Sequence, residues 1–163
     1  MDKSIINISK LEFAGFPGGW PEHVKEKYEG STYAFAGRLI GAKKLGYSVI
    51  KLPPGKRAFQ FHSHRVNEEM FFVLEGAGEV RIGDKTYPIK KGDFMAHPPG
   101  DAATAHQIIN TSAEELVYLG ISTKEGPEIA DYPDSKKFGV MTADGSFRFL
   151  GKADQSLGYW DGE

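Results

Sequence analysis

Short runs of alternating apolar and polar residues fill the middle of the chain, from about residue 35 to residue 122. Such alternation is typical of β-strands that pack one face on a core, because successive strand side chains point to opposite faces. Turns rich in glycine and proline separate the runs, and no helical periodicity lies between them. The pattern therefore predicts strands over residues 36–40, 45–52, 58–64, 69–75, 79–82, 86–89, 93–97, 104–110 and 116–121.

This spacing favours a single all-β domain, an antiparallel sandwich or small barrel over residues 35–122, rather than a βαβ fold. Residues 1–34 predict an N-terminal arm with an extended piece near Leu11, a turn at residues 17–19 and a short helix from Pro21 to about Tyr28. Residues 123–163 predict a C-terminal arm that is polar but rich in aromatic residues. We expect these aromatic residues to pack on the barrel or on a second subunit: Tyr132, Phe138, Phe147, Phe149, Tyr159 and Trp160.

Strand parity assigns the side chains to two faces. If His62 and His64 point inward, Gln60 and Ala58 do so too, and the intervening phenylalanines, Phe59 and Phe61, point outward. The next strand is apolar on both faces, with Glu69, Phe71 and Val73 on one and Met70, Phe72 and Leu74 on the other. A single-layer barrel should have a polar exterior, so either the terminal arms or a partner must cover the outer face. We predict a homodimer built on that covering.

Composition narrows the function classes. The chain of 163 residues has 20 glycines, 9 prolines, no cysteine and a net charge of −2. Without cysteine there are no disulfides and no thiol chemistry, which agrees with a reducing compartment. Basic and acidic residues are interspersed, so we expect neither a nucleic-acid nor a membrane partner. The first residues lack a long apolar run, which predicts no signal peptide and a cytoplasmic protein.

Four side chains form a candidate metal site: His62, His64, Glu69 and His106. Histidines one residue apart in a strand share a face, with Cβ atoms roughly 7 Å apart. A single ion with bonds of about 2.1 Å can bridge that span. A carboxylate just past the following turn and a histidine from a distant strand would complete the site. Three imidazoles and one carboxylate suit Zn, Fe, Mn, Ni or Co, and the set does not choose among them.

The segment around the first three ligands resembles the first cupin motif. Gly55 is followed by His62 and His64, then by Glu69 after four residues and by Gly76 after six more. The gap between Gly55 and His62 is one residue longer than in the family pattern.

The segment around the fourth ligand resembles the second cupin motif. Gly92 is followed by Pro98 and Gly100, then by His106 and Asn110. The loop between Gly100 and His106 is three residues longer than in the family pattern. Two separated motifs in the right order identify residues 35–122 as similar to a cupin.

This resemblance implies a jelly-roll β-barrel in which the four side chains bind one divalent metal and leave positions open for water or substrate. The size of the chain is similar to that of small cupins grouped with mannose-6-phosphate isomerase and sugar phosphate isomerases, an analogy at the level of the fold. We therefore expect a small-molecule substrate. The alternative is a barrel that keeps the fold with an empty or merely structural site.

Other residues carry open interpretations. His97, at a strand end, is either a pocket acid or base or a partly exposed loop residue. Gln60 shares the metal face and is either a substrate contact, a partner of a ligand or a polar residue at the barrel mouth. Glu68 competes with Glu69 as a ligand, but parity puts it on the opposite face. Five basic residues near the start of the barrel have two alternative roles, either to bind a substrate phosphate or only to solubilise the surface: Arg38, Lys43, Lys44, Lys56 and Arg57.

The leading functional hypothesis is isomerisation of a small sugar or sugar phosphate. The metal would hold adjacent oxygens and stabilise an enediolate while a base moves a proton between carbons. His97, Asp101 and Tyr132 are the candidate proton carriers. The alternatives are a mononuclear metal dioxygenase of an enediol or phenol, and a binding module without turnover. Gln60 and His97 are the candidate catalytic residues.

Overall fold

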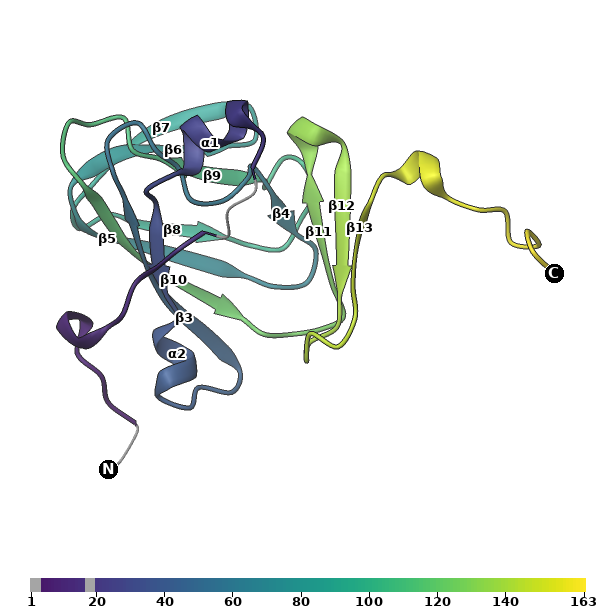
Figure 1. Cartoon of the computed structure of the whole chain (residues 1–163), viewed down its shortest axis with the longest axis horizontal. Helices are drawn as coiled ribbons and strands as arrows, with labels where there is room; N and C mark the ends of the chain where they lie inside the picture. The colour runs from purple at the N-terminus through teal and green to yellow at the C-terminus, as the bar shows by residue number, and fades with distance from the viewer. Residues whose placement is uncertain (1–3, 17–19) are drawn as a thin grey trace.

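The computed structural model describes residues 4–16 and 20–163 and shows antiparallel β-sheets around one core (Figure 1). The predicted all-β antiparallel fold is confirmed, and the predicted turn at residues 17–19 lies outside the described residues. A six-stranded sheet has the order β1 (Ala14–Gly15), β2 (Thr32–Ala34), β3 (Leu45–Leu52), β10 (Leu116–Thr123), β5 (Glu69–Glu75) and β8 (Phe94–His97).

Two smaller sheets complete the architecture. A three-stranded sheet has the order β7 (Lys85–Lys90), β6 (Ala77–Ile82) and β9 (His106–Ile109). A four-stranded sheet has the order β13 (Arg148–Gly151), β12 (Lys137–Met141), β11 (Glu128–Tyr132) and β4 (Ser63–His64). The helices are short: α1 (Glu22–Tyr28), α2 (Ala36–Leu39) and the 3₁₀ turns η1 (Ile8–Lys10), η2 (Pro133–Ser135) and η3 (Ala153–Gln155).

The main core lies between the six-stranded and three-stranded sheets. Leu52, Val73 and Tyr118 of the larger sheet pack with Val80 and Ile108 of the smaller one. Along β5, Phe71 and Val73 are buried, so they and Glu69 point inward as the alternation predicts. The candidate ligand Glu69 therefore lies at one end of a strand whose inner face packs in the core.

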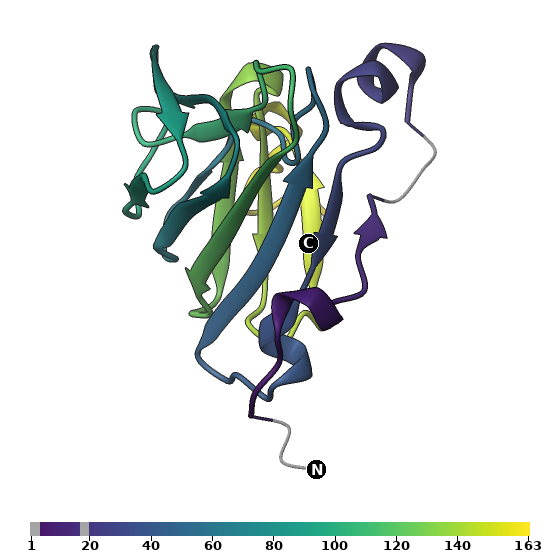
Figure 2. The same ribbon diagram turned by 90° about the vertical axis from the view of Figure 1, so that its left-hand side faces the viewer.

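The outer face of the six-stranded sheet is covered in part by the N-terminal segment. Leu11 packs on Val49 and Val117, with Leu74 at the margin of this cluster. Figure 2 shows the purple N-terminal segment running along one side of the sheet. Toward the edge strand β8 the same face is exposed, and Phe94 on β8 is 71% exposed.

The predicted strand over residues 36–40 is wrong, because this segment forms the one-turn helix α2. Ile40 N–H donates to the Ala36 carbonyl and Ala42 N–H donates to the Gly37 carbonyl, which closes the turn. Ala36, Leu39 and Ile40 have the i, i+3, i+4 spacing of a helix, and in five residues this spacing is hard to distinguish from alternation.

The predicted strand over residues 58–64 is also wrong over most of its length. Only Ser63 and His64 form a strand, while His62 makes an isolated bridge to His106. Because the segment before them is irregular, strand parity does not hold there. Phe61, expected on the outside, is 5% exposed and lies under the Arg81 guanidinium, and Gln60, expected inside, is exposed.

The C-terminal residues divide into two parts. Strands β11, β12 and β13 extend the sheet that contains β4, and β11 pairs with β4 through Ala130 opposite His64. Beyond Gly151 the chain leads away from the body (Figure 1), and Tyr159 and Trp160 are 88% and 76% exposed. Packing on the barrel of the same chain, one of the two expected alternatives, is therefore wrong for this aromatic pair. Within the part of the chain that the structure describes, no helix has the length and apolar character needed to cross a membrane.

Candidate metal centre

Three histidines converge on one carboxylate oxygen of Glu69. The Nε2 atoms of His62, His64 and His106 lie 3.9, 3.5 and 3.0 Å from Glu69 Oε2. Strand β5 supplies the glutamate, β4 and the residue before it supply His64 and His62, and β9 supplies His106. His62 and His106 are locked together by backbone hydrogen bonds of 3.2 and 2.8 Å in both directions. The structure thus brings together the four residues that the sequence singled out.

The Nδ1 atom of each histidine faces an acceptor on the far side of its ring. His62 Nδ1 lies 2.7 Å from the Gln60 carbonyl, and His106 Nδ1 lies 3.4 Å from the Thr104 carbonyl. His64 Nδ1 lies 3.5 Å from Glu128 Oε2. An Nδ1–H that faces an acceptor leaves Nε2 with a free lone pair, which is the usual arrangement around a histidine metal ligand.

The donor set fits a divalent transition metal. One ligand atom each from His62, His64 and Glu69 lie within 4.8 Å of one another, the range that one ion can span. His106 Nε2 approaches the same carboxylate. These side chains could hold one ion, and neutral imidazoles with a carboxylate suit Zn, Fe, Mn or Ni.

Burial and mutual contacts shift the pKa values of these groups. Burial lowers the pKa of His62 to about 4, despite the opposing carboxylate of Glu69. Burial also acts to lower the pKa of His64, but Glu69 and Glu128 outweigh it and raise that pKa. Burial alone would raise the pKa of Glu69, yet hydrogen bonds from His106 and His64 hold it well below its usual range. The site therefore favours an ionised carboxylate beside a largely neutral His62, as metal binding requires.

His97 lies behind the ligands. Its side chain is 3% exposed, so the reading as a partly exposed loop residue is wrong. Its ring stacks on His106 at a centroid distance of 3.9 Å, and Phe71 packs against it at 5.1 Å. Burial and the neighbouring His106 lower the pKa of His97 to about 3. His97 is thus a neutral imidazole that supports the ring of His106.

A pocket of about 230 Å³ opens beside His62. Its wall is largely aromatic and contains no Lys, Arg, Asp or Glu side chain. Tyr132 stacks on His62 with ring planes 21° apart, and Phe59 lies 6.4 Å from the same imidazole. The full lining is Phe16, Trp20, Val24, Tyr28, Ala58, Phe59, Gln60, His62 and Tyr132.

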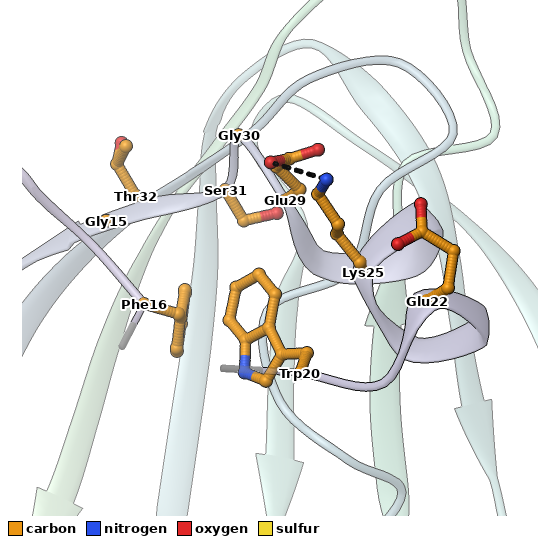
Figure 3. A pocket seen from close by; sticks show the side chains of 9 residues that line it. All are labelled: Gly15, Phe16, Trp20, Glu22, Lys25, Glu29, Gly30, Ser31 and Thr32. Carbon is orange, nitrogen blue, oxygen red and sulfur yellow. Dashed lines mark ion pairs between the residues drawn. The ribbon is translucent and has the colours of Figure 1, made fainter. Parts of the chain in front are cut away.

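Phe16 and Trp20 also line a second, outer hollow of about 560 Å³ beside α1. Figure 3 shows the indole between Phe16 and the helix, with the Lys25–Glu29 ion pair at the far rim. The residues that line the outer hollow include none of the four candidate ligands. The inner pocket is therefore the one that adjoins the metal centre.

The remaining residues singled out from the sequence are placed as follows. Gln60 lines the inner pocket and accepts a hydrogen bond of 3.5 Å from Lys137. Glu68 is exposed, as parity predicted. Lys56 donates to the Glu26 carbonyl and Arg57 to Gln107, and the basic cluster as a whole does not contribute to the pocket lining.

Sequence reasoning missed two parts of this centre. One is the aromatic wall from the N-terminal arm, whose signal was the density of aromatic residues in residues 13–33. The other is Glu128, a single acidic residue in a polar stretch with no local signal. Both come from outside the stretch that resembles a known family.

We expect the metal-free protein to lose stability as the pH falls from 6.5 towards 5. His62 and His97 have lowered pKa values when folded, so the unfolded chain binds more protons in this range. The raised pKa of His64 opposes this effect slightly, leaving a net loss of about 2–3 kcal/mol. Urea unfolding at several pH values measures it. His97→Leu should flatten the dependence, and stability that rises on acidification would contradict the expectation.

Comparison with known proteins gives a consistent picture. The family model described as "Cupin domain" matches residues 48–122. A crystal structure of a proposed sugar phosphate isomerase from Acidithiobacillus ferrooxidans is 30% identical, covers 78% of this chain and 80% of that chain, and has a TM-score of 0.71. A cupin-superfamily sugar phosphate isomerase from Silicibacter pomeroyi is 24% identical, covers 96% and 98% of the two chains, and has a TM-score of 0.80, which shows likeness of fold.

The curated relatives match over a shorter stretch. An oxalate-binding protein from Thermotoga maritima is 32% identical over 75 residues. That stretch is 46% of this chain and 59% of the relative, and a second relative is matched over 51% of its length. The chain therefore spans little more than half of the length of these two relatives.

Proposed function

The chain belongs to the cupin superfamily, and we propose from this premise that it is a metal-dependent enzyme that isomerises a small sugar or sugar phosphate. The observation that carries the proposal is the convergence of His62, His64 and His106 on Glu69 beside an accessible pocket. We assign these four side chains as the ligands of one divalent ion. The ion, when bound, supplies a Lewis acid for adjacent oxygens of an open-chain sugar.

The pocket wall supplies the contacts to the substrate. The flat faces of Tyr132 and Phe59 can pack on the carbon skeleton of a sugar. Gln60 offers an amide to a substrate hydroxyl, and Lys137 beside it offers a positive charge to a phosphate at the rim. The pocket lining has no Lys or Arg side chain. A phosphate inside the pocket would therefore lose its hydration without gaining a positive partner from the lining. The phosphate, where present, is therefore placed outward.

Tyr132 is the proposed general acid, which protonates a substrate oxygen while water in the pocket takes up the carbon-bound proton. Of the three carriers considered, it lines the pocket, whereas His97 is buried behind His106 and Asp101 is exposed with its carboxylate on the Ala103 N–H. Burial raises the pKa of the Tyr132 phenol, so it stays protonated at neutral pH and can donate to a substrate oxygen. We propose that His97 acts through His106 rather than on the substrate.

Exchange with deuterated water tests the reaction. The metal-loaded protein is incubated with a panel of aldoses, ketoses and their phosphates, and products are followed by mass spectrometry and NMR. Interconversion with solvent deuterium at the carbon next to the carbonyl is the expected result. Tyr132→Phe should slow the exchange while leaving metal content unchanged. No interconversion and no label across the panel would remove the proposal.

A second candidate function follows from the aromatic wall. Five aromatic side chains around a small pocket also suit a planar phenol or enediol, the substrate of a mononuclear metal dioxygenase. Oxygen uptake that requires Fe(II) and fails with redox-inert Zn would favour this reading. A ligand held unchanged, with neither oxygen uptake nor exchange, would instead identify a binding protein.

We also propose that the protein is a homodimer through the open side of the six-stranded sheet. The tilted rings of Phe72 and Phe94 pack there with centroids 4.3 Å apart, and the N-terminal segment packs elsewhere on this face. Sedimentation at micromolar concentration should give twice the chain mass, and Phe94→Glu should give a monomer. Tyr87→Glu, an exposed aromatic on β7, is the matched control. A monomeric wild-type protein would contradict the proposal.

A further inference from the structure

Glu128, the first residue of β11, is 3% exposed and surrounded by N–H donors. Its Oε1 accepts hydrogen bonds from the backbone of Arg65 and Val66 at 3.1 and 3.2 Å, and its Oε2 from that of Asn67 at 2.8 Å. The Ile129 N–H and the Asn67 side-chain amide also donate to it. A buried carboxylate is stable only when it is satisfied in this way.

The three consecutive backbone donors form the turn between β4 and β5. This turn separates His64, the last residue of β4, from Glu69, the first residue of β5. Two of the four proposed metal ligands therefore stand at the two ends of a four-residue segment in which three backbone N–H groups donate to one side chain, while the fourth, that of Glu68, donates to Thr123. The spacing between these ligands depends on Glu128.

The same carboxylate also faces His64 directly. Glu128 Oε2 lies 3.5 Å from His64 Nδ1, a buried nitrogen that has no hydrogen-bond partner among the residues that the structure describes. His62 and His106 face backbone carbonyls at the corresponding position, so His64 is the proposed ligand backed by a charged group. A carboxylate behind a ligating imidazole fixes the ring and makes Nε2 a stronger donor.

We infer that Glu128 is the positioning residue of the metal site, holding the turn that spaces His64 from Glu69 and aligning the His64 ring. The inference rests on the metal site of the proposed function and not on the reaction. Glu128 lies beyond residues 48–122, the part that the family model matches, so the site depends on a segment outside the recognised domain.

Cobalt binding tests the inference, because Co(II) reports ligand geometry through its visible absorption. Glu128→Gln keeps the shape of the side chain but replaces an acceptor oxygen with an NH₂ group. It should weaken Co(II) binding by about 10–100-fold and change the absorption bands. Asp131→Asn is the matched control, since Asp131 lies on the same strand and binds Arg65 of the same turn at 2.7 Å. The control variant should bind Co(II) with an affinity within about threefold of that of the wild-type protein.

A second variant separates alignment from mere stability of the turn. Asn67→Ala removes the side-chain hydrogen bonds with Glu125, Thr123 and Glu128 but leaves the carboxylate and its backbone donors in place. It should lower the melting temperature of the metal-free protein and retain the wild-type cobalt spectrum. Equal spectral changes in Asn67→Ala and Glu128→Gln would overturn the alignment role.

Two further outcomes are decisive. Wild-type affinity and spectrum in Glu128→Gln would overturn the inference while leaving the proposed function intact. A wild-type protein that binds no cobalt would overturn the metal site, and this inference with it. If Glu128→Gln does not fold, NMR of the zinc-loaded wild-type protein decides, because the inference requires a hydrogen-bonded Nδ1–H on His64. Its absence would overturn the inference.

Discussion

Replacing His106 with alanine is expected to weaken divalent-metal binding by more than about 100-fold. His106 Nε2 makes the shortest of the three imidazole contacts to Glu69, at 3.0 Å. Loss of a residue that merely supports a ligand costs about 10–100-fold, and loss of a ligand costs more. Elemental analysis of the purified protein and competition with a chelating dye measure occupancy and affinity together. His62→Ala should also weaken divalent-metal binding.

The matched control is His23→Ala, which removes an exposed histidine from α1. It should leave metal content and affinity unchanged. Circular dichroism shows whether His106→Ala still folds, because the substitution also removes the ring on which His97 stacks. Unchanged metal stoichiometry in both His62→Ala and His106→Ala would require a different set of ligands.

Replacing Gly76 with alanine is expected to destabilise the fold by about 2–5 kcal/mol. Gly76 has φ of +79°, and an added Cβ would overlap the Glu115 carbonyl and lie 3.0 Å from Leu116 Cα. The left-handed backbone costs a non-glycine residue about 1–2 kcal/mol. Relief of the overlap with backbone atoms that cannot rotate away adds about 1–3 kcal/mol. Urea unfolding of the metal-free protein measures the loss.

Gly55→Ala separates the two contributions. Gly55 has nearly the same φ, +76°, but no heavy atom within 4 Å of the added Cβ. It should cost only about 1–2 kcal/mol, the backbone part of the effect. Equal losses in the two variants would mean that the close approach of Gly76 to the backbone of Glu115 and Leu116 adds nothing to the destabilisation.

The sequence predicted most strands because their signals are local. The segments at residues 45–52 and 69–75 form β3 and β5 with the same bounds. The failures occur where the pattern is short or interrupted. Ala36, Leu39 and Ile40 fit a helical turn as well as a strand, and the segment before Ser63 is irregular, which reversed the expected positions of Gln60 and Phe61.

The four proposed ligands could be singled out for a similar reason. His62 and His64 lie one residue apart, and Glu69 begins the next strand, so their convergence depends mainly on local geometry. Only His106 comes from a distant segment, and it is placed by its backbone pairing with His62.

The supporting parts of the site could not be predicted because they depend on distant contacts. Glu128 bonds to residues more than 60 positions earlier in the chain. Trp20 and Tyr28 reach the pocket from the N-terminal arm, about 40 positions from His62. No spacing rule connects such residues, since their proximity is set by how the arms pack on the barrel.

The pairing of β11 with β4 has a consequence for where the chain can be shortened. A version ending at residue 122, the limit of the family match, would lose β11 and leave the backbone N–H and C=O groups of β4 exposed on that side. Unprotected strand edges recruit strands from other molecules. Such a truncated domain should self-associate and precipitate, although every proposed metal ligand would still be present in it.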